Sequence, residues 1–436
     1  MLTTNTPWKS IIKFALPLML ANILQQLYNT ADTIIVGNFI SQNALAAVGS
    51  CMYITSLYTA ISIAIGLGAG VIVAQGFGAD NNKKVKNGAG TGFLMLLCLG
   101  LLISVFSFLS GEFVLKKIIS VPNEIFNSAL VYIKIYSLGL FFQFGYNAFA
   151  SILRAVGNSK SSLYFLIITA VINVLLDLIF VIVFKLGIGS VAIATCISQL
   201  TAMVISYIYM IKKYPIFKPK WNYNKITAAE ILQTGIPLTI QALIVNCGFM
   251  IMQKIANSFG AEVTASYSVA CRLEIYLLIP IISILHSMST FAGQNYGAEN
   301  FARIRSGMKH AICLNLVIAS LFGGLCFLFA EQIISLFALK GLAFKYAVAN
   351  FKLTCVDLLL YAAYSPVNGI CIGLGKSYVL SIISFVELLG RIGFALALSN
   401  IIGVACVWWS EPLAWSIVVF GVCLYYKYIL KKELIK

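Results

Sequence analysis

The sequence predicts an all-α integral membrane protein with twelve transmembrane helices in two six-helix lobes. Three observations lead to this fold class. Hydrophobic residues make up 60% of the 436 residues and charged residues 10%, and the mean hydropathy is +0.94, which excludes a water-soluble surface. Apolar segments of roughly 20 to 30 residues, long enough to cross a bilayer as helices, recur along the whole chain. Finally, the polar loop that begins at position 75 is repeated at position 294, about half the chain length later.

The apolar segments between loop signals define the expected elements in chain order. Pro17, Pro237, Pro280 and Pro366 lie inside them and mark expected kinks. The N-terminus has no cleavable signal pattern, so we expect the first span to be retained. The twelve predicted spans are residues 11–40, 47–78, 87–110, 123–151, 159–184, 188–212, 228–258, 263–291, 304–330, 343–372, 377–400 and 405–428.

Lys and Arg are distributed unevenly between the predicted loops. Of the 30 basic residues, 20 lie at the termini or in the even-numbered loops, and only Lys116, Lys117, Lys185, Lys340 and Lys345 lie in the odd-numbered loops. The positive-inside rule then places both termini in the cytoplasm, and we expect a multi-pass protein of the plasma (cytoplasmic) membrane. The net charge of +16 reflects this placement and does not indicate a nucleic-acid partner.

The duplication extends beyond the repeated loop. Six spans per half is an even number, so both halves share one orientation, and we expect a pseudo-twofold axis along the membrane normal. The predicted domains are an N-terminal lobe at residues 1–212, a cytoplasmic linker at 213–227, and a C-terminal lobe at 228–436. Two such bundles favour alternating access through a central cavity. The matching segments are 75–88 with 294–307, 14–17 with 234–237, and 154–159 with 372–377.

Two acidic residues lie inside predicted spans of the N-terminal half, Asp32 in span 1 and Asp177 in span 5. Ionisable groups inside a membrane are costly, so each needs a partner or a function. Asp32, Asp177 and Thr195 all lie about seven or eight residues, or roughly 12 Å, below the outer ends of their spans. Asn173 is one helical turn from Asp177. Carboxylate, amide and hydroxyl oxygens suit a Na⁺ ion or a shared proton.

Structural explanations of the same residues stay open. The two acids are also able to pair with Lys134, the basic residue predicted at depth in this half. The hydroxyl of Thr195 is also able to bond to the backbone of its own helix.

Several motifs together resemble the multidrug and toxic compound extrusion (MATE) transporters. The resemblance covers nearly the whole chain and implies secondary antiport, in which organic, often cationic, compounds are exported against inward Na⁺ or H⁺. It also implies a cation site built from Asp32, Asn173, Asp177 and Thr195. The motifs are residues 29–37, 44–48, 153–157, 173–177 and 403–412, together with the two repeated loops that begin at Gln75 and Gln294.

The C-terminal half holds further ionisable residues. Asp357 and Glu274 form a possible second ionisable site, although Asp357 lies about a turn from the span 10 position of other branches of the family, and the span 7 acid is missing. Glu387 and Arg391 are four residues apart and are predicted to form a structural ion pair. We expect substrate to bind between the halves, at Gln25, Tyr28 and Asn29 of span 1 and at Gln241, Asn246 and Met250 of span 7.

The sequence therefore predicts an antiporter with an organic small-molecule substrate, membrane lipid as its surroundings, and no nucleic-acid partner. We expect a monomer without a cofactor, coupled to either Na⁺ or H⁺. A lipid-linked oligosaccharide flippase of the same superfamily is the alternative. A membrane-embedded enzyme or receptor would need a catalytic cluster or a polar loop domain, and the sequence has neither, so we do not expect an enzyme. Eleven cysteines without CxxC spacing indicate neither a disulfide framework nor a zinc site.

Overall fold

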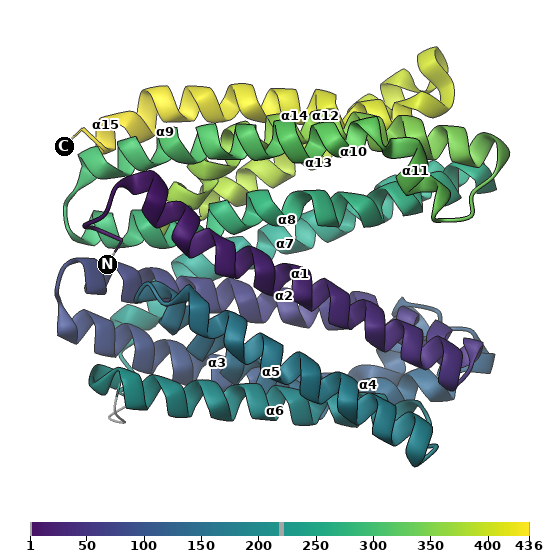
Figure 1. Cartoon of the computed structure of the whole chain (residues 1–436), viewed down its shortest axis with the longest axis horizontal. Helices are drawn as coiled ribbons and strands as arrows, with labels where there is room; N and C mark the ends of the chain where they lie inside the picture. Colours follow the sequence, from purple (N-terminus) through teal and green to yellow (C-terminus); the bar gives the residue numbers. More distant parts are fainter. Residues whose placement is uncertain (1, 218–221, 436) are drawn as a thin grey trace. The chain divides into compact units, whose positions relative to one another are not determined.

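The computed structural model describes residues 2–217 and 222–435 (Figure 1). Residues 218–221 of the predicted linker lie outside the described part. The described residues form helices joined by short loops and contain no β-strand. The helices are α1 Pro7–Phe39, α2 Gln42–Gly78, α3 Asn82–Phe113, α4 Asn123–Ala155, α5 Ser159–Leu178, α6 Ile188–Lys213, α7 Lys225–Ser258, α8 Ala261–Gly297, α9 Phe301–Ile318, α10 Gly324–Leu328, α11 Ala330–Ser335, α12 Gly341–Gly373, α13 Tyr378–Ile402, α14 Cys406–Tyr425 and α15 Lys431–Glu433. Short π-helical segments extend α3, α5, α9 and α14 as η1 Val114–Ile118, η2 Ile179–Val183, η4 Ala319–Gly323 and η6 Tyr426–Leu430, and the 3₁₀ turns are η3 Pro215–Phe217 and η5 Gly403–Ala405.

Eleven stretches of the described residues are long and apolar enough to cross a membrane. The last one, Tyr378–Glu433, is 56 residues long and contains a reversal between α13 and α14. At this reversal Gly403 has a φ of 55°, a conformation that glycine adopts without strain. Gly390 on α13 then packs against Ala414 on α14. Counted by helices, the described chain therefore has the twelve spanning segments that the sequence predicts.

The duplication seen in the sequence is present in the helices. α2 and α8 each contain 37 residues, and α4 and α12 each contain 33. In the repeated loop, Asp80 and Glu299 have φ values of 53° and 56°. One residue later, the side chains of Asn81 and Asn300 accept hydrogen bonds from the first turns of α3 and α9, at 2.9 and 3.2 Å, which caps both helices. The two copies of the loop thus fold in the same way.

By packing, the chain divides into two compact units. The N-terminal unit is Pro17–Thr239, and the C-terminal unit is Met1–Leu16 together with Ile240–Lys436. The division therefore passes through α1 and α7, close to a proline in each helix. Within the C-terminal unit, the backbone carbonyl of Ile11 accepts a hydrogen bond from Ser287 at 3.0 Å. The lobe limits at residues 1–212 and 228–436 stay a prediction about the order of the spans.

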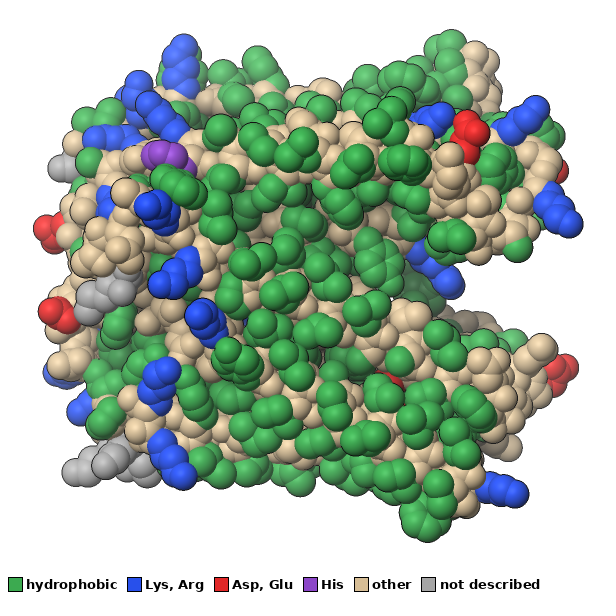
Figure 2. Space-filling model, viewed as in Figure 1, with side chains coloured by type: hydrophobic (Ala, Val, Ile, Leu, Met, Phe, Trp, Pro, Cys, Tyr) green, Lys and Arg blue, Asp and Glu red, His purple; other side chains and the backbone are tan. Residues whose placement is uncertain are grey.

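The surface of the helices is largely apolar. Figure 2 shows hydrophobic side chains over the middle of the visible face, with Lys and Arg gathered toward the helix ends. Large apolar side chains such as Leu109 and Leu336 are 74% and 82% exposed. Such exposure is unfavourable in water but suits contact with lipid acyl chains. The chain is therefore a multi-pass membrane protein.

Small residues allow close packing of helices inside each unit. A Cβ atom at Gly369 of α12 would lie 2.5 Å from the carbonyl oxygen of Leu285 and 2.8 Å from Cβ of Met288, both on α8. We expect Gly369→Ala to lower the free energy of unfolding by about 1 to 3 kcal/mol, because backbone atoms must shift. Gly393→Ala is the matched control, since a Cβ there meets nothing within 4 Å and gains about 1 kcal/mol of helix propensity. Thermal unfolding of the purified variants measures both effects, and equal stability of the two would contradict the expectation.

Candidate functional site

Three of the four predicted cation ligands lie together in the N-terminal unit. With its amide nitrogen turned toward Asp32 of α1, Asn173 of α5 donates hydrogen bonds of 3.1 and 3.2 Å to the two carboxylate oxygens of Asp32. Asp177 lies one turn further along α5, and its carboxyl group is within hydrogen-bonding reach of Asp32. The structure therefore brings Asp32, Asn173 and Asp177 into one site. We call Asp32 and Asp177 the N-terminal acid pair.

Asp177 is the most enclosed member of this site. Its side chain is 0% exposed, and neither of its carboxylate oxygens has a hydrogen-bond partner among the described residues. Carboxylate oxygens only accept hydrogen bonds, so a bond between Asp177 and Asp32 requires a proton on one of them. A buried carboxylate without donors is strongly destabilised. The arrangement is therefore suited to hold either a proton or a small cation.

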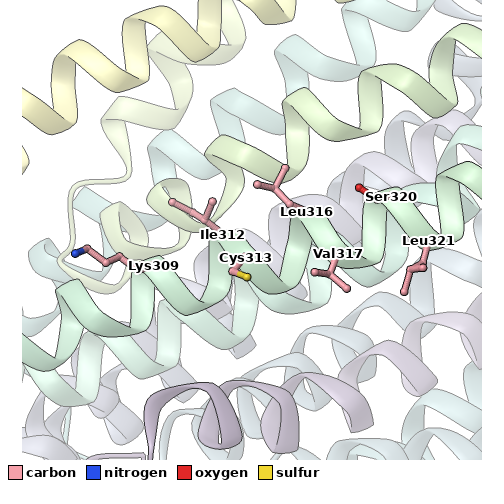
Figure 3. Close-up of a pocket in the computed structure, with 7 residues that line it drawn as sticks. All are labelled: Lys309, Ile312, Cys313, Leu316, Val317, Ser320 and Leu321. Atoms are coloured by element: carbon pink, nitrogen blue, oxygen red, sulfur yellow. The ribbon is translucent and has the colours of Figure 1, made fainter.

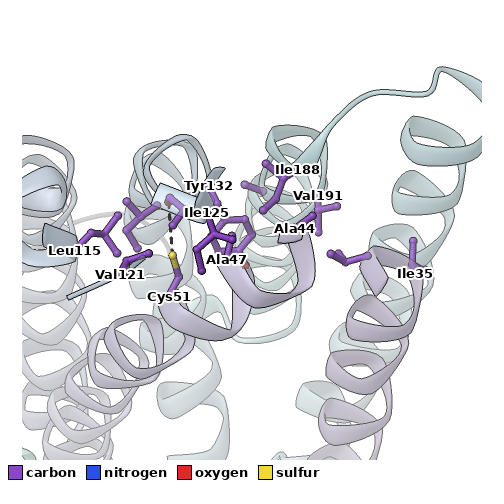
Figure 4. Close-up of a cluster of buried hydrophobic side chains, with 14 of the residues drawn as sticks. Ile35, Ala44, Ala47, Cys51, Leu115, Val121, Ile125, Tyr132, Ile188 and Val191 are labelled. Atoms are coloured by element: carbon purple, nitrogen blue, oxygen red, sulfur yellow. Dashed lines mark hydrogen bonds between the residues drawn. The ribbon is translucent and has the colours of Figure 1, made fainter. Parts of the chain in front are cut away.

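An apolar cluster includes residues next to the acids on α1 and α5. Ile35 and Val36 of α1 pack there with residues of α2, α4 and α6, and Val174 and Leu178 of α5 pack against them. Figure 4 shows part of this cluster, in which the thiol of Cys51 reaches the carbonyl of Ala129. Since these neighbours of the acids are apolar, they exclude water and strengthen electrostatic interactions at the site.

Tyr132 of α4 lies near the acids and Tyr136 stacks on it, and neither tyrosine was predicted from the sequence. Tyr132 is buried beside Asp32 and Asp177, and its ring stacks on Tyr136, with 6.0 Å between centroids. Tyr136 continues a polar path, because its hydroxyl is within hydrogen-bonding reach of Thr59 and Gln143. The four-residue spacing of the tyrosines in span 4 was the signal that could have identified them.

The sequence left the roles of Thr195 and Lys134 open. The hydroxyl of Thr195, on α6, donates to the backbone carbonyl of Val191 at 3.0 Å, so it makes the local bond that was the alternative to a ligand. Its oxygen keeps lone pairs for a second partner. Lys134 lies over the ring of Phe108 at 5.8 Å, and it forms no ion pair among the described residues. Lys134 therefore does not neutralise the acid pair.

The predicted substrate residues lie on two helices. On α1, Tyr28 is within hydrogen-bonding reach of Gln25 and close to Asp32, whereas Asn29 is exposed. On α7, Gln241 is half-buried, Met250 is 61% exposed, and the exposed Asn246 bonds to the carbonyl of Ala242 at 2.8 Å. The three residues of α1 belong to the N-terminal unit, and those of α7 belong to the C-terminal unit.

Glu274 and Asp357 are buried in the C-terminal unit, and they share their surroundings with two further charged groups. Arg391 of α13 donates to Glu411 of α14 at 3.0 Å. The predicted ion pair between Glu387 and Arg391 is thus wrong: Glu387 instead accepts a hydrogen bond from the indole of Trp415 at 2.8 Å. The i, i+4 rule describes neighbours on one helix, and here a carboxylate on the adjacent helix reaches the guanidinium. Glu411 belongs to the family motif at residues 403–412, but the sequence analysis did not predict that its side chain is buried.

An apolar pocket of about 610 Å³ lies elsewhere, along α9 and η4. Figure 3 shows its lining, with Lys309 at one end and Leu321 at the other. None of the predicted site residues lines it. It is therefore a feature separate from both groups of buried charges.

Comparison with known proteins gives a consistent picture. The family model MatE matches residues 17–179 and 237–397. The chain is 27% identical over 439 residues to the "Probable multidrug resistance protein YoeA" of Bacillus subtilis (strain 168), covering 98% of this chain and 95% of that protein. It is 30% identical over 309 residues to "Probable multidrug resistance protein YpnP" of the same organism, covering 69% and 68%. A solved structure, "Outward-facing conformation of a multidrug resistance MATE family transporter of the MOP superfamily", matches with a TM-score of 0.92 at 21% identity, covering 99% and 98%. None of these relatives is named as an enzyme.

Proposed function

Because the chain belongs to the MatE family of transporters, we propose that it exports organic, amphipathic and cationic compounds in exchange for Na⁺ or H⁺ by alternating access. It is a multi-pass membrane transporter and not an enzyme. In the proposed orientation, both termini lie in the cytoplasm and the chain crosses the plasma membrane as a monomer. The coupling ion takes the place of a cofactor. The apolar pocket along α9, with Lys309 at one end, supports contact with an acyl chain of a membrane lipid.

The observation that carries this proposal is the state of Asp177. Its carboxylate is fully enclosed and lacks any hydrogen-bond donor among the described residues, yet a second carboxylate lies beside it. If both neighbouring carboxylates were ionised, their negative charges would repel each other strongly, because the dielectric constant is low in a buried site. A bound cation, either Na⁺ or a proton, removes that repulsion. The site is therefore expected to alternate between loaded and unloaded states.

Asn173 suits both states because its amide is able to turn over. With the nitrogen toward Asp32, it donates two hydrogen bonds that stabilise an ionised carboxylate. With the oxygen toward Asp32, it joins the carboxylates as an oxygen ligand, the type that hard cations prefer. Thr195 is the proposed fourth ligand.

Helix α1 links the cation to the substrate in this proposal. It carries Asp32 and also the proposed substrate residues Gln25, Tyr28 and Asn29, of which Tyr28 lies close to Asp32. Gln241, Asn246 and Met250 of α7 are the proposed substrate residues of the C-terminal unit. Antiport requires that cation and substrate prefer different conformations. A shift of α1 about Pro17, which lies inside that helix, would couple them.

The test is export of ethidium from proteoliposomes, with a Na⁺ gradient and a pH gradient imposed separately. Export that follows one gradient identifies the coupling ion and supports antiport. Export that responds to neither gradient contradicts the coupling. Absence of ethidium transport under both gradients would favour the oligosaccharide flippase, which should then be tested by translocation of a lipid-linked pyrophosphate sugar.

Thr195 gives a finer test of the cation site. Thr195→Val removes the hydroxyl at nearly constant volume, and we expect the cation concentration for half-maximal export to rise about tenfold, or about 1.4 kcal/mol. Thr195→Ser keeps the hydroxyl, so its cation concentration for half-maximal export should equal that of the wild type. Thr201→Val is the matched control, because half-buried Thr201 makes the same local bond, to Ile197 at 2.8 Å. Equal behaviour of the Thr195 and Thr201 valine variants would remove Thr195 from the site.

A further inference from the structure

The residues that precede α1, numbers 2–6, are bound on the C-terminal unit, and we call them the strap. They lie beside the turn between α8 and α9, which is the second copy of the repeated loop (Figure 1). The backbone nitrogen of Leu2 donates to Oε1 of Gln294 at 3.1 Å. Arg303 of α9 donates to the carbonyl oxygen of Leu2 from Nε at 3.3 Å and from Nη2 at 3.0 Å, and it also donates to the carbonyl of Asn5. One guanidinium thus holds two peptide carbonyl groups of the strap.

The place that receives the strap is buried and polar. The side chains of Gln294 and Asn295 are 0% exposed, and Leu2 itself is 7% exposed. The amide of Asn295 donates to the carbonyl of Phe291 at 2.8 Å and lies 3.5 Å from the carbonyl oxygen of Leu2. The guanidinium of Arg303 lies over the ring of Phe291, 5.4 Å from its centroid. Hydrogen bonds from a charged donor are stronger than neutral ones, so Arg303 is the main anchor of the strap.

The first copy of the repeated loop closes on itself instead. Lys84 stands 219 positions before Arg303, and its ammonium group donates to Oε1 of Gln75 at 3.1 Å. In the second copy, the corresponding glutamine and arginine both bind Leu2. Both copies turn and are capped in the same way, so the folding of the loop does not require the strap. The planar fork of an arginine donates to several acceptors at once, which the ammonium group of a lysine does not match.

The first part of α1 continues from the strap and is also held on the C-terminal unit. The carbonyl of Ile11 accepts a hydrogen bond from Ser287 of α8 at 3.0 Å, and the side chains of Ile11 and Phe14 are 0% and 3% exposed. At Pro17 the chain passes into the N-terminal unit, where α1 carries Asp32. Helix α1 therefore has one part fastened to the C-terminal unit and another part that carries a proposed cation ligand.

A helix transmits a movement between two bodies only when it is held in both. If the first part of α1 were free to slide, sliding would absorb a shift of Asp32 on cation binding, and the C-terminal unit would not respond. With the strap bound, the shift has to occur at Pro17, which lies inside α1 and lacks a backbone N–H donor. The fastened strap thus makes the conformation of α1 depend on the state of the cation site, as coupling requires.

We propose that Arg303 is a positioning residue for antiport: it holds the strap, and the strap fixes the first part of α1 to the C-terminal unit. Cation binding at Asp32 is thereby linked to a change of conformation and not to a sliding of α1. The coupling role rests on the proposed function, whereas the binding of the strap by Arg303 does not.

Thiol labelling tests whether Arg303 holds the strap. Leu2→Cys is introduced into the full chain after the exposed cysteines have been replaced by serine, namely Cys98, Cys247, Cys313 and Cys423. Because position 2 is buried, we expect the introduced thiol to react slowly with a hydrophilic maleimide, and about tenfold faster when Arg303→Gln allows the strap to open. Thr6→Cys, at an exposed position of the strap, should react fast in both backgrounds. Equal rates at position 2 with and without Arg303 would overturn the proposal.

Transport in proteoliposomes tests whether the held strap matters for coupling. Arg303→Gln is expected to lower ethidium export by about tenfold and to raise the number of cations that enter per ethidium exported, because cation binding no longer drives the conformational change. The affinity of the purified protein for ethidium should stay the same, since the proposed substrate residues are untouched. Lys84→Gln is the matched control in the first copy of the loop, and it should export like the wild type with an unchanged number of cations per ethidium.

Arg303→Lys keeps the charge but not the fork, so its labelling and export rates should lie between those of the wild type and Arg303→Gln. It decides the result if Arg303→Gln does not fold. A purely structural role of Arg303 would lower thermal stability but leave the number of cations per ethidium unchanged, and that result would overturn the coupling role. If the wild type exports no ethidium under either gradient, the proposed function fails and the coupling role fails with it. The labelling rates then still show whether Arg303 holds the strap.

Discussion

Asp177→Asn is expected to reduce ion-driven ethidium export by about 100-fold or more, or about 2.8 kcal/mol, without loss of folding. The amide has nearly the volume of the carboxyl group, so packing around this fully buried side chain is kept. Its nitrogen is able to donate to Asp32, the partner beside it, which removes the repulsion that a coupling cation would otherwise neutralise. The variant therefore resembles a permanently loaded state and should not cycle. Asp32→Asn is expected to act in the same direction.

The measurement compares initial export rates in proteoliposomes under each ion gradient, together with the thermal stability of the same samples. Asp80→Asn is the matched control, because Asp80 lies in the loop after α2 with a φ of 53°, a conformation that asparagine also tolerates. It should export like the wild type. Continued export by Asp32→Asn and Asp177→Asn under both gradients would show that the acid pair is not the coupling site.

Glu411→Leu is expected to lower the free energy of unfolding by about 3 to 5 kcal/mol, because it leaves the guanidinium of Arg391 buried without its closest partner. The double variant Glu411→Leu with Arg391→Met should recover most of this loss, since replacing both charges removes the desolvation cost. Glu331→Gln should change stability by less than about 1 kcal/mol, as expected for an exposed pair.

Unfolding is readily followed in this protein by thiol labelling. Cys51, Cys355, Cys371 and Cys406 are buried free cysteines, so a thiol-reactive dye reports their exposure as the temperature rises. An early transition in Glu411→Leu that is reversed in the double variant would support the argument. If removing Glu411 alone leaves the transition unchanged, the ion pair does not stabilise the C-terminal unit.

Much of the fold could be predicted from the sequence because hydrophobic length decides where a helix crosses a membrane. The predicted span 188–212 compares with α6 at Ile188–Lys213, and 343–372 with α12 at Gly341–Gly373. The helix starts were less accurate: α2 begins at Gln42, not at residue 47. Polar residues such as Ser41 form the cap there, accepting a bond from Ala44 at 3.1 Å, and a hydropathy window does not detect caps.

The candidate sites were predictable only where one helix contains the relevant spacing. Asn173 and Asp177 are one turn apart, so their common face follows from the sequence. That Asp32 reaches them depends on how α1 packs on α5, and its depth in the membrane was the only guide. Arg391 has Glu387 on its own helix and Glu411 on the next one, and the packing of α13 on α14 selected Glu411. Partners across helices are set by tertiary packing, which neither spacing nor hydropathy contains.

The two compact units meet in the chain after Leu16 and after Thr239, so two fragments separated between α6 and α7 would not match the units. A break in the connector between α6 and α7 would produce one fragment without residues 225–239 of the N-terminal unit. The other fragment would lack residues 1–16 of the C-terminal unit. Since each fragment carries a segment that completes the other unit, the fragments should be recovered as a folded pair when coexpressed and degraded when expressed alone. We therefore expect neither half of the duplicated chain to be stable without the other.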